Sequence, residues 1–149
     1  MLKASVRIKK LRPDAQLPTY GSPDAAGADL CALTEEAGLS IAPGETAMVH
    51  TGLSIELPQG YAGLVYARSG LAAKRGLAPA NKVGVIDPDY RGEIMIALHN
   101  HGSAPAAVQN GERVAQLVIT PYLTAEFTEA DALSDTARGE GGFGSTGRK

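Results

Sequence analysis

The sequence contains one cysteine, and no long apolar run follows its positively charged first residues. A lone cysteine, Cys31, cannot form a disulfide within the chain, which is consistent with a reducing compartment. Without an apolar run at the start, we expect neither a signal peptide nor a membrane anchor there. Together these absences predict a soluble, cytoplasmic protein that has no membrane partner.

Basic side chains are not in excess, because 14 Lys and Arg stand against 16 Asp and Glu, for a net charge of −2. This balance argues against a broad nucleic-acid surface, which usually needs a surplus of positive charge. Internal repeats and long linkers are also missing. A chain of 149 residues with 44% hydrophobic side chains can bury one core, so we expect one domain and no nucleic-acid partner.

Glycine and proline are abundant, with 18 and 9 copies. Both residues break helices and mark turns, so many short strands are expected. In residues 46–60, Leu53, Ile55 and Leu57 alternate with polar residues, as in a half-buried strand. Other strand-like runs are residues 5–11, 61–67, 93–100 (with Ile94, Ile96 and Leu98 on one face) and 113–122, the last apolar enough to be buried on both faces. The pattern predicts an all-β fold, a jelly roll or a related barrel.

Residues 69–76 form the one segment that looks helical, with Ser69 as a possible cap and Gly76 as a possible end. Arg68 precedes the Ser69-Gly70 pair, and such a start can bind an anion. A capped surface helix beside a solvated arginine explains the same residues equally well. Both interpretations stay open at this point.

Asp87 and Asp29 can each be interpreted either as a functional carboxylate or as part of a turn or cap. Asp87 follows Val85 and Ile86 at the end of a strand-like run, where partial desolvation would make it a candidate general base. A plain turn also explains Asp87, because Pro88 follows it. Asp29 lies among small and apolar residues, an unusual place for a charge, although a satisfied turn or cap is the more common explanation.

Two histidines, the cysteine and the glycine-rich end can also be interpreted in more than one way. His99 and His101 would share one face of a strand, but a metal site needs a third ligand nearby. Cys31 has no base beside it and is interpreted as a small core residue. The glycine-rich residues 138–149 lack the strand and helix that a dinucleotide-binding glycine pattern requires. They form either a disordered end or a mobile flap in which Arg138 contacts phosphates and Phe143 stacks on a base.

Five segments occur in a revealing order: "AGADL" at 26–30, "ARSGLA" at 67–72, "NKVGVIDPDYRGEI" at 81–94, "GERVAQLVI" at 111–119 and "RGEGGFGSTG" at 138–147. In order and spacing, this set resembles the five motifs of the trimeric dUTPase family. The resemblance covers about residues 18–147, and "LPTY" near the start is also typical of the family.

The resemblance implies a jelly-roll domain over residues 1–137 and a flexible flap over residues 138–149. It implies a homotrimer whose active sites take residues from all three chains. The implied reaction is hydrolysis of dUTP to dUMP and pyrophosphate, which limits dUTP and supplies dUMP for thymidylate synthesis. The implied cofactor is Mg²⁺, held mainly by the triphosphate, with Asp29 holding its water shell.

The resemblance also assigns roles to the remaining site residues. Asp87 would position and deprotonate the water that attacks the α-phosphorus. Residues expected to bind uracil and deoxyribose are Asn81, Gly84, Val85, Ile86, Tyr90 and Phe143. Residues expected to bind phosphates are Arg68, Ser69, Gly70, Gln116, Arg138, Gly144, Ser145 and Thr146.

Two positions depart from the family pattern, because Ala67 stands where proline is usual and Ala28 where a larger residue is usual. Neither carries the implied chemistry. The related dCTP deaminases share the fold, but their second motif needs a Ser-Ser pair and here Gly70 follows Ser69. A trimeric binding module without turnover is the remaining alternative, and intact Asp87, Gln116 and Arg138 argue against it.

Overall fold

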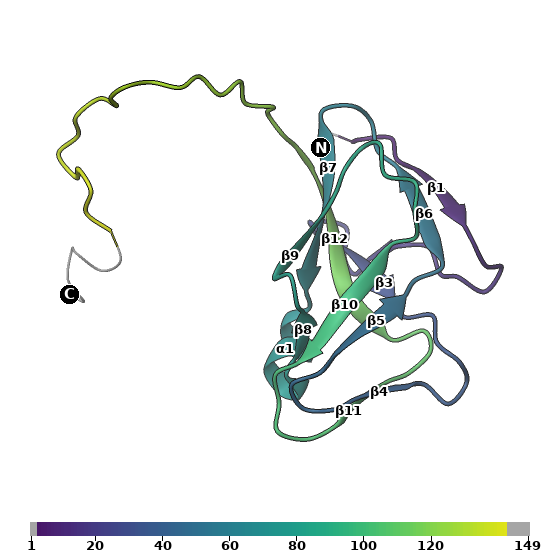
Figure 1. Ribbon diagram of the computed structural model, residues 1–149. Coiled ribbons are helices and arrows are strands. Elements are labelled where there is room, and N and C mark those ends of the chain that lie inside the picture. The colour runs from purple at the N-terminus through teal and green to yellow at the C-terminus, as the bar shows by residue number, and fades with distance from the viewer. Residues whose placement is uncertain (1–2, 143–149) are drawn as a thin grey trace.

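The computed structural model describes residues 3–142, and it shows a body of short strands with one helix and a long C-terminal segment (Figure 1). The elements in chain order are β1 (Arg7–Lys10), β2 (Thr19–Tyr20), β3 (Ala28–Cys31), β4 (Leu39–Ile41), β5 (Thr46–His50), β6 (Leu53–Glu56), β7 (Tyr61–Ala67), α1 (Ser69–Arg75), β8 (Leu77–Pro79), β9 (Val83–Ile86), β10 (Met95–Asn100), β11 (Ala106–Val108) and β12 (Arg113–Pro121). The predicted all-β fold with a short helix is confirmed.

The strands form four antiparallel sheets around a shared core. The largest has the order β2-β3-β12-β7-β9, and a second has the order β5-β10-β8. Two strand pairs, β1-β6 and β4-β11, complete the body. Residues from all four sheets meet in one apolar cluster, for example Leu30, Leu53, Leu98 and Val108. Burial of this cluster is the main driving force for the fold.

The strand-like patterns are largely confirmed, with two corrections. Ile94, Ile96 and Leu98 lie buried on one face, as expected. The run from Thr46 to Gly60 is not one strand, because the chain turns at Gly52, whose φ is 67°, and β5 and β6 enter different sheets. A positive φ of this kind is inexpensive for glycine.

The second correction concerns residues 113–122. Val114 and Ala115 are both buried, which fits a strand covered on two sides. Further along, Val118 and Ile119 are only half-buried. The prediction of burial on both faces therefore holds only for the first half of β12, which also carries a bulge at its pairing with β3.

Of the two caps predicted for helix α1, the one at its start is wrong and the one at its end is confirmed. Arg68 is the N-cap and makes no side-chain cap hydrogen bond, so the interpretation of Ser69 as the cap is wrong. Gly76 does end the helix, with a φ of 66° and its N–H donating to the carbonyl of Ala72 at 3.1 Å. Within residues 3–142, no helix is long and apolar enough to cross a membrane.

Beyond β12 the chain leaves the body as an extended arm, drawn in green to yellow in Figure 1. Residues 122–140 are all exposed. Three large apolar side chains on this arm, Leu123, Phe127 and Leu133, are 97%, 94% and 89% exposed. Large apolar side chains are most often buried in folded proteins. The arm therefore carries apolar surface that a single chain leaves exposed.

Candidate functional site

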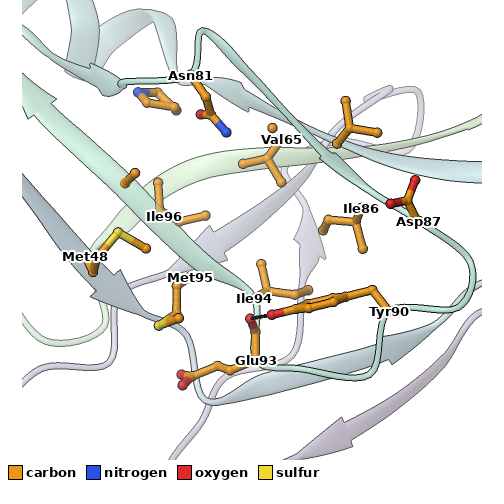
Figure 2. A pocket seen from close by; sticks show the side chains of 14 residues that line it. Met48, Val65, Asn81, Ile86, Asp87, Tyr90, Glu93, Ile94, Met95 and Ile96 are labelled. Carbon is orange, nitrogen blue, oxygen red and sulfur yellow. Dashed lines mark hydrogen bonds between the residues drawn. The ribbon is translucent and has the colours of Figure 1, made fainter.

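A cavity of about 250 Å³ opens between β9 and β10. Six residues proposed from the sequence line it: Asn81, Gly84, Val85, Ile86, Asp87 and Tyr90. The rest of the lining is mostly apolar and comes from β5, β7, β8 and β10 and from the turn before β10: Met48, Val65, Pro79, Glu93, Ile94, Met95, Ile96 and Ala97. Figure 2 shows Asn81 at one end of this cavity, with Asp87 and Tyr90 at the other.

The pairing of β9 with β7 decides which of these residues face inward. Gly84 lies opposite Val65, and both are buried, as is Ile86. A Cβ added to Gly84 would lie 3.2 Å from the amide nitrogen of Asn81 and 3.3 Å from the Cβ of Val65. The missing side chain therefore lets the Asn81 amide lie close against β9. Just before β9, Lys82 takes a φ of 63°, which turns the chain sharply between Asn81 and Val83.

Tyr90 is held by its own turn. Its hydroxyl donates to the carbonyl of Glu93 at 2.9 Å (Figure 2). A Cβ at Gly92 would lie 2.3 Å from the same hydroxyl oxygen. Gly92 thus leaves room for the ring to fold back over the turn, and the hydrogen bond fixes the direction of the ring along the cavity wall.

Glu93 anchors this turn to the β5–β6 corner, a role that sequence reasoning missed. Its Oε1 accepts the Gly52 N–H at 2.8 Å, and its Oε2 lies 2.9 Å from Nδ1 of His50. Burial raises the pKa of Glu93, but the hydrogen bonds from His50 and Gly52 outweigh it and leave that pKa below its ordinary value. The contacts span more than 40 positions, so no local pattern pointed to them.

Asp87 is exposed in the single chain, which corrects the expectation of partial desolvation. The alternation of strand β9 explains the difference. Ile86 faces the core, while Val85 on the opposite face is 61% exposed, and Asp87 shares the parity of Val85. The apolar residues that precede Asp87 in the sequence therefore did not predict how exposed its carboxylate is.

A second group of predicted residues gathers around Asp29 on β3. Asp29 is buried, and each of its carboxylate oxygens accepts a hydrogen bond from an arginine: Oδ1 from Arg68 Nε at 2.8 Å and Oδ2 from Arg113 Nη1 at 3.1 Å. Gln116 lies opposite Asp29 in the β3–β12 pairing, and its Nε2 donates to the carbonyl of Ala67 at 3.2 Å. The unusual position of Asp29 is thus explained by two ion pairs.

Arg113 was not identified from the sequence, since an arginine at the start of a strand is a common surface residue. Pairing with β3 brings it to Asp29, 84 positions away. We name Asp29, Arg68, Arg113 and Gln116 the Asp29 cluster. Ser69 and Gly70 are exposed at the start of α1, directly after Arg68. None of these six residues lines the cavity at β9 and β10.

The remaining predicted residues lie on the C-terminal arm or beyond it. Arg138 is exposed on the arm, and its Nε donates to the carbonyl of Gly141 at 2.7 Å. The structure does not bring Arg138 to the cavity or to the Asp29 cluster. Phe143, Gly144, Ser145 and Thr146 lie outside the described residues.

The structure also shows the surroundings of the two histidines and the cysteine considered above, His99, His101 and Cys31. His99 and His101 face each other edge to face, with ring centroids 4.4 Å apart. From Lys3 to Gly142, no group of three or more His, Cys, Asp or Glu side chains could hold a metal ion. Cys31 is half-buried rather than a core residue, and burial, followed by the charge of Asp29, raises the pKa of its thiol.

Comparison with known proteins identifies the family to which the chain belongs. The family model described as dUTPase matches residues 13–147. Proteins named deoxyuridine 5'-triphosphate nucleotidohydrolase from two strains of Desulfitobacterium hafniense are 52% identical over 150 aligned positions, which cover 99% of this chain and 99% of each relative.

Among solved structures, the dUTPase of Staphylococcus bacteriophage 80alpha with dUPNHPP is 28% identical, with a TM-score of 0.84 over 96% of this chain and 98% of that one. A mutant of the same phage enzyme is 27% identical, with a TM-score of 0.85 over 97% and 99%. Sequence and fold therefore agree over nearly the whole length, and the chain belongs to the dUTPase family.

Proposed function

We propose that this protein hydrolyses dUTP to dUMP and pyrophosphate by attack of water on the α-phosphorus. The observation that carries the proposal is the cavity at β9 and β10, which is lined by all six described residues assigned to the uracil hairpin and its carboxylate. Membership of the dUTPase family supports the same substrate.

The cavity suits a flat, small base. Asn81 and the backbone of residues 84–86 offer donors and acceptors, while Val65, Ile86 and Ile96 supply apolar walls. Fixed donors and acceptors that match uracil would be left unpaired by cytosine, which rejects dCTP. Tyr90 at the far end of the cavity would pack against the deoxyribose and exclude a ribose 2′-hydroxyl.

Asp87 would act as the general base. Its carboxylate lines the mouth of the cavity beside Tyr90 (Figure 2), so a water held there would lie near the α-phosphorus of a nucleotide whose base fills the cavity. The exposure of Asp87 in one chain leaves space for that water. Proton removal by a positioned carboxylate contributes typically about 10²–10⁴-fold to such rates.

The phosphates would be bound by Arg68, Ser69, Gly70 and Gln116. Mg²⁺ would be held by the triphosphate and would neutralise its charge, with Asp29 contacting the metal's water shell. The hydrogen bonds that Asp29 already accepts leave room for a contact with the water shell of the metal. A carboxylate offers about four lone-pair sites, and the two arginines use one on each oxygen.

Asp87 and Arg68 lie toward opposite ends of β7. Ile86, which precedes Asp87, pairs with Gly63, whereas Arg68 follows the far end of the strand, five positions beyond Gly63. At about 3.3 Å per residue, Asp87 and Arg68 are roughly 15–20 Å apart along the sheet. We therefore propose that an active site combines the cavity of one chain with the Asp29 cluster of another, within a homotrimer.

The exposed arm supports the assembly, because a neighbouring chain would cover Leu123, Phe127 and Leu133. We propose that residues 138–149, which follow this arm in the sequence, form the flap. Arg138, Gly144, Ser145 and Thr146 would then close over the phosphates of a neighbouring site, and Phe143 over the base. We retain the cytoplasm as the expected location.

The test measures pyrophosphate release from dUTP, UTP, dTTP and dCTP, with and without Mg²⁺. We expect release from dUTP alone, and only with the metal. Native mass spectrometry of the same sample should show a trimer. Ammonia release from dCTP would favour a deaminase instead, and nucleotide binding without pyrophosphate release would favour a binding module.

A further inference from the structure

Helix α1 needs outside support to keep its orientation. It has seven residues, and Leu71 is its buried side chain. Helices this short are not stable alone in water, since nucleation is costly. The contacts that bind α1 to the strands therefore decide how it sits, and with it the direction of Arg68 at its start.

Arg75, in the last turn, makes one of these contacts. One of its guanidinium nitrogens, Nη1, donates to Oε1 of Glu112, and the other, Nη2, donates to the carbonyl of Ala107. Glu112 is itself fixed, because its Oε2 accepts the Gln109 N–H at 3.1 Å. Leu71 and Arg75 are four positions apart and so share one face of the helix, the face that packs on the strands.

The two ends of α1 are tied to consecutive residues of the chain. At the end of the helix Arg75 contacts Glu112, and at its start Arg68 donates to Asp29 and to the carbonyl of Arg113. Arg113 in turn donates to Asp29. The contacts close a ring that runs from α1 through residues 112–113 and Asp29 back to α1.

We infer that Arg75 is a positioning residue: its fork to Glu112 and Ala107 holds α1 against residues 112–113 and so keeps Arg68 and Asp29 aligned for the phosphate chain. The role rests on the proposed function, in which Arg68 binds phosphate. Arg75 itself touches no substrate. A planar fork suits two acceptors at fixed positions, and a lysine cannot serve both in the same way.

This role differs from a contribution to overall stability. The side chains of Arg75 and Glu112 are 36% and 25% exposed, so solvent screens their attraction. A loss of the pair should leave the fold intact. It should let α1 shift, and misplaced binding groups can cost up to about 10²-fold in such sites.

Arg75→Met tests this inference, because methionine keeps an apolar stem and removes the fork. The matched control is Lys74→Met, which removes the same charge from an exposed neighbour in the same turn. Calorimetry on the full-length protein would measure the affinity for a non-hydrolysable dUTP analogue and for deoxyuridine. We expect Arg75→Met to weaken the analogue roughly 10-fold and leave deoxyuridine unchanged, with Lys74→Met equal to the wild type for both.

A second variant and a second measurement keep the test independent of catalysis. Glu112→Gln should reproduce the effect of Arg75→Met, and the double variant should be no weaker than either single one. In NMR spectra the Arg68 Nε–H signal, identified by its loss in Arg68→Lys, should move in Arg75→Met but not in Lys74→Met.

Three results would overturn the role of Arg75: unchanged analogue affinity in Arg75→Met, an equal loss of deoxyuridine affinity, or an unmoved Arg68 signal. If the wild type did not bind the analogue while the Arg68 signal still moved, the proposed function would fail and the positioning of Arg68 by Arg75 would stand.

Discussion

The cavity at β9 and β10 and the Asp29 cluster differ in how they are built. The cavity has mostly apolar walls, formed by residues of β5, β7, β8, β9 and β10. The cluster is made of charges, with one buried carboxylate between two arginines. Shape and hydrogen bonds can select a base in the first, and charge can bind phosphates in the second.

The difference indicates a division of labour between the cavity and the Asp29 cluster. The pairing of β7 with β9 and the packing of β10 set the walls of the cavity. Arg68 is half-buried beside Asp29, with Ser69 and Gly70 exposed next to it, and none of the three lines the cavity. Under the proposed function, variants of the cavity and of the cluster should have separable effects on nucleoside and triphosphate binding.

The largest effect is expected at Asp87. Asp87→Asn should lower kcat by about 10²–10⁴-fold, because the amide cannot accept the proton of the attacking water. Affinity for the dUTP analogue should remain within a few-fold of the wild type, since the base acts in the transition state. Steady-state rates and calorimetry on the same sample check both parts, and unchanged turnover would refute the assignment.

Deleting residues 138–149 should have the next largest effect. The truncated protein would lose the hydrogen bonds that we propose between Arg138 and the phosphates. Charged hydrogen bonds of this kind are worth about 1.5–3 kcal/mol, or roughly 10–150-fold in kcat/KM. The truncated protein should remain a trimer with the melting temperature of the full chain, because residues 138–140 are exposed and the Arg138 side chain bonds within its own segment. A truncated protein that unfolds would show that this segment is structural.

Asp29→Asn tests the Asp29 cluster directly. The amide cannot pair with two arginines, so we expect roughly 10-fold weaker binding of the dUTP analogue and a free energy of unfolding lower by about 1–3 kcal/mol. Deoxyuridine should bind as before. Asp14→Asn, at an exposed aspartate paired with Arg12, is the control and should bind the analogue normally. Equal losses for nucleoside and analogue would contradict the division between the cavity and the Asp29 cluster.

Glu93→Gln should have the smallest effect, and one that depends on pH. The pKa of Glu93 lies below its ordinary value in the folded protein. Its carboxylate therefore stabilises the fold above the unfolded pKa, and this stabilisation is lost as the pH falls through the folded pKa. We expect the variant to be about 1 kcal/mol less stable near neutral pH, with the gap closing in acid. Urea unfolding at several pH values measures this.

The control for Glu93 is Glu36→Gln, at an exposed acid on a loop, which should follow the wild type at every pH. A stability difference for Glu93→Gln that stayed constant on acidification would show that the carboxylate does not act through its charge. A large loss of deoxyuridine binding in the same variant would show that Glu93 also fixes Tyr90.

The strand pattern and the motif residues were open to prediction because their signals are local. Alternation at Ile94, Ile96 and Leu98 gave the buried face of β10 correctly, and Gly76 marked the end of α1. The six cavity residues lie within ten consecutive positions, and they were identified by the resemblance of that segment to a dUTPase motif. Short-range order of this kind is recorded directly in neighbouring residues.

Other features depended on contacts between distant positions. The two arginines on Asp29 and the pairing of Glu93 with the β5–β6 corner follow from how the strands meet. These contacts join residues 39 to 84 positions apart, and no short window of sequence contains both partners.

The chain's own residue order thus established the all-β class and one short helix, because turn chemistry and alternation act over a few positions, while the motif residues were identified by their resemblance to the dUTPase family. Which carboxylate is buried and which is exposed, and the grouping of the motif residues into a cavity and a separate Asp29 cluster, were decided only by the tertiary structure. The physical reason is that burial and pairing are properties of how strands meet, and the two arginines that pair with Asp29 lie 39 and 84 positions away from it in the sequence.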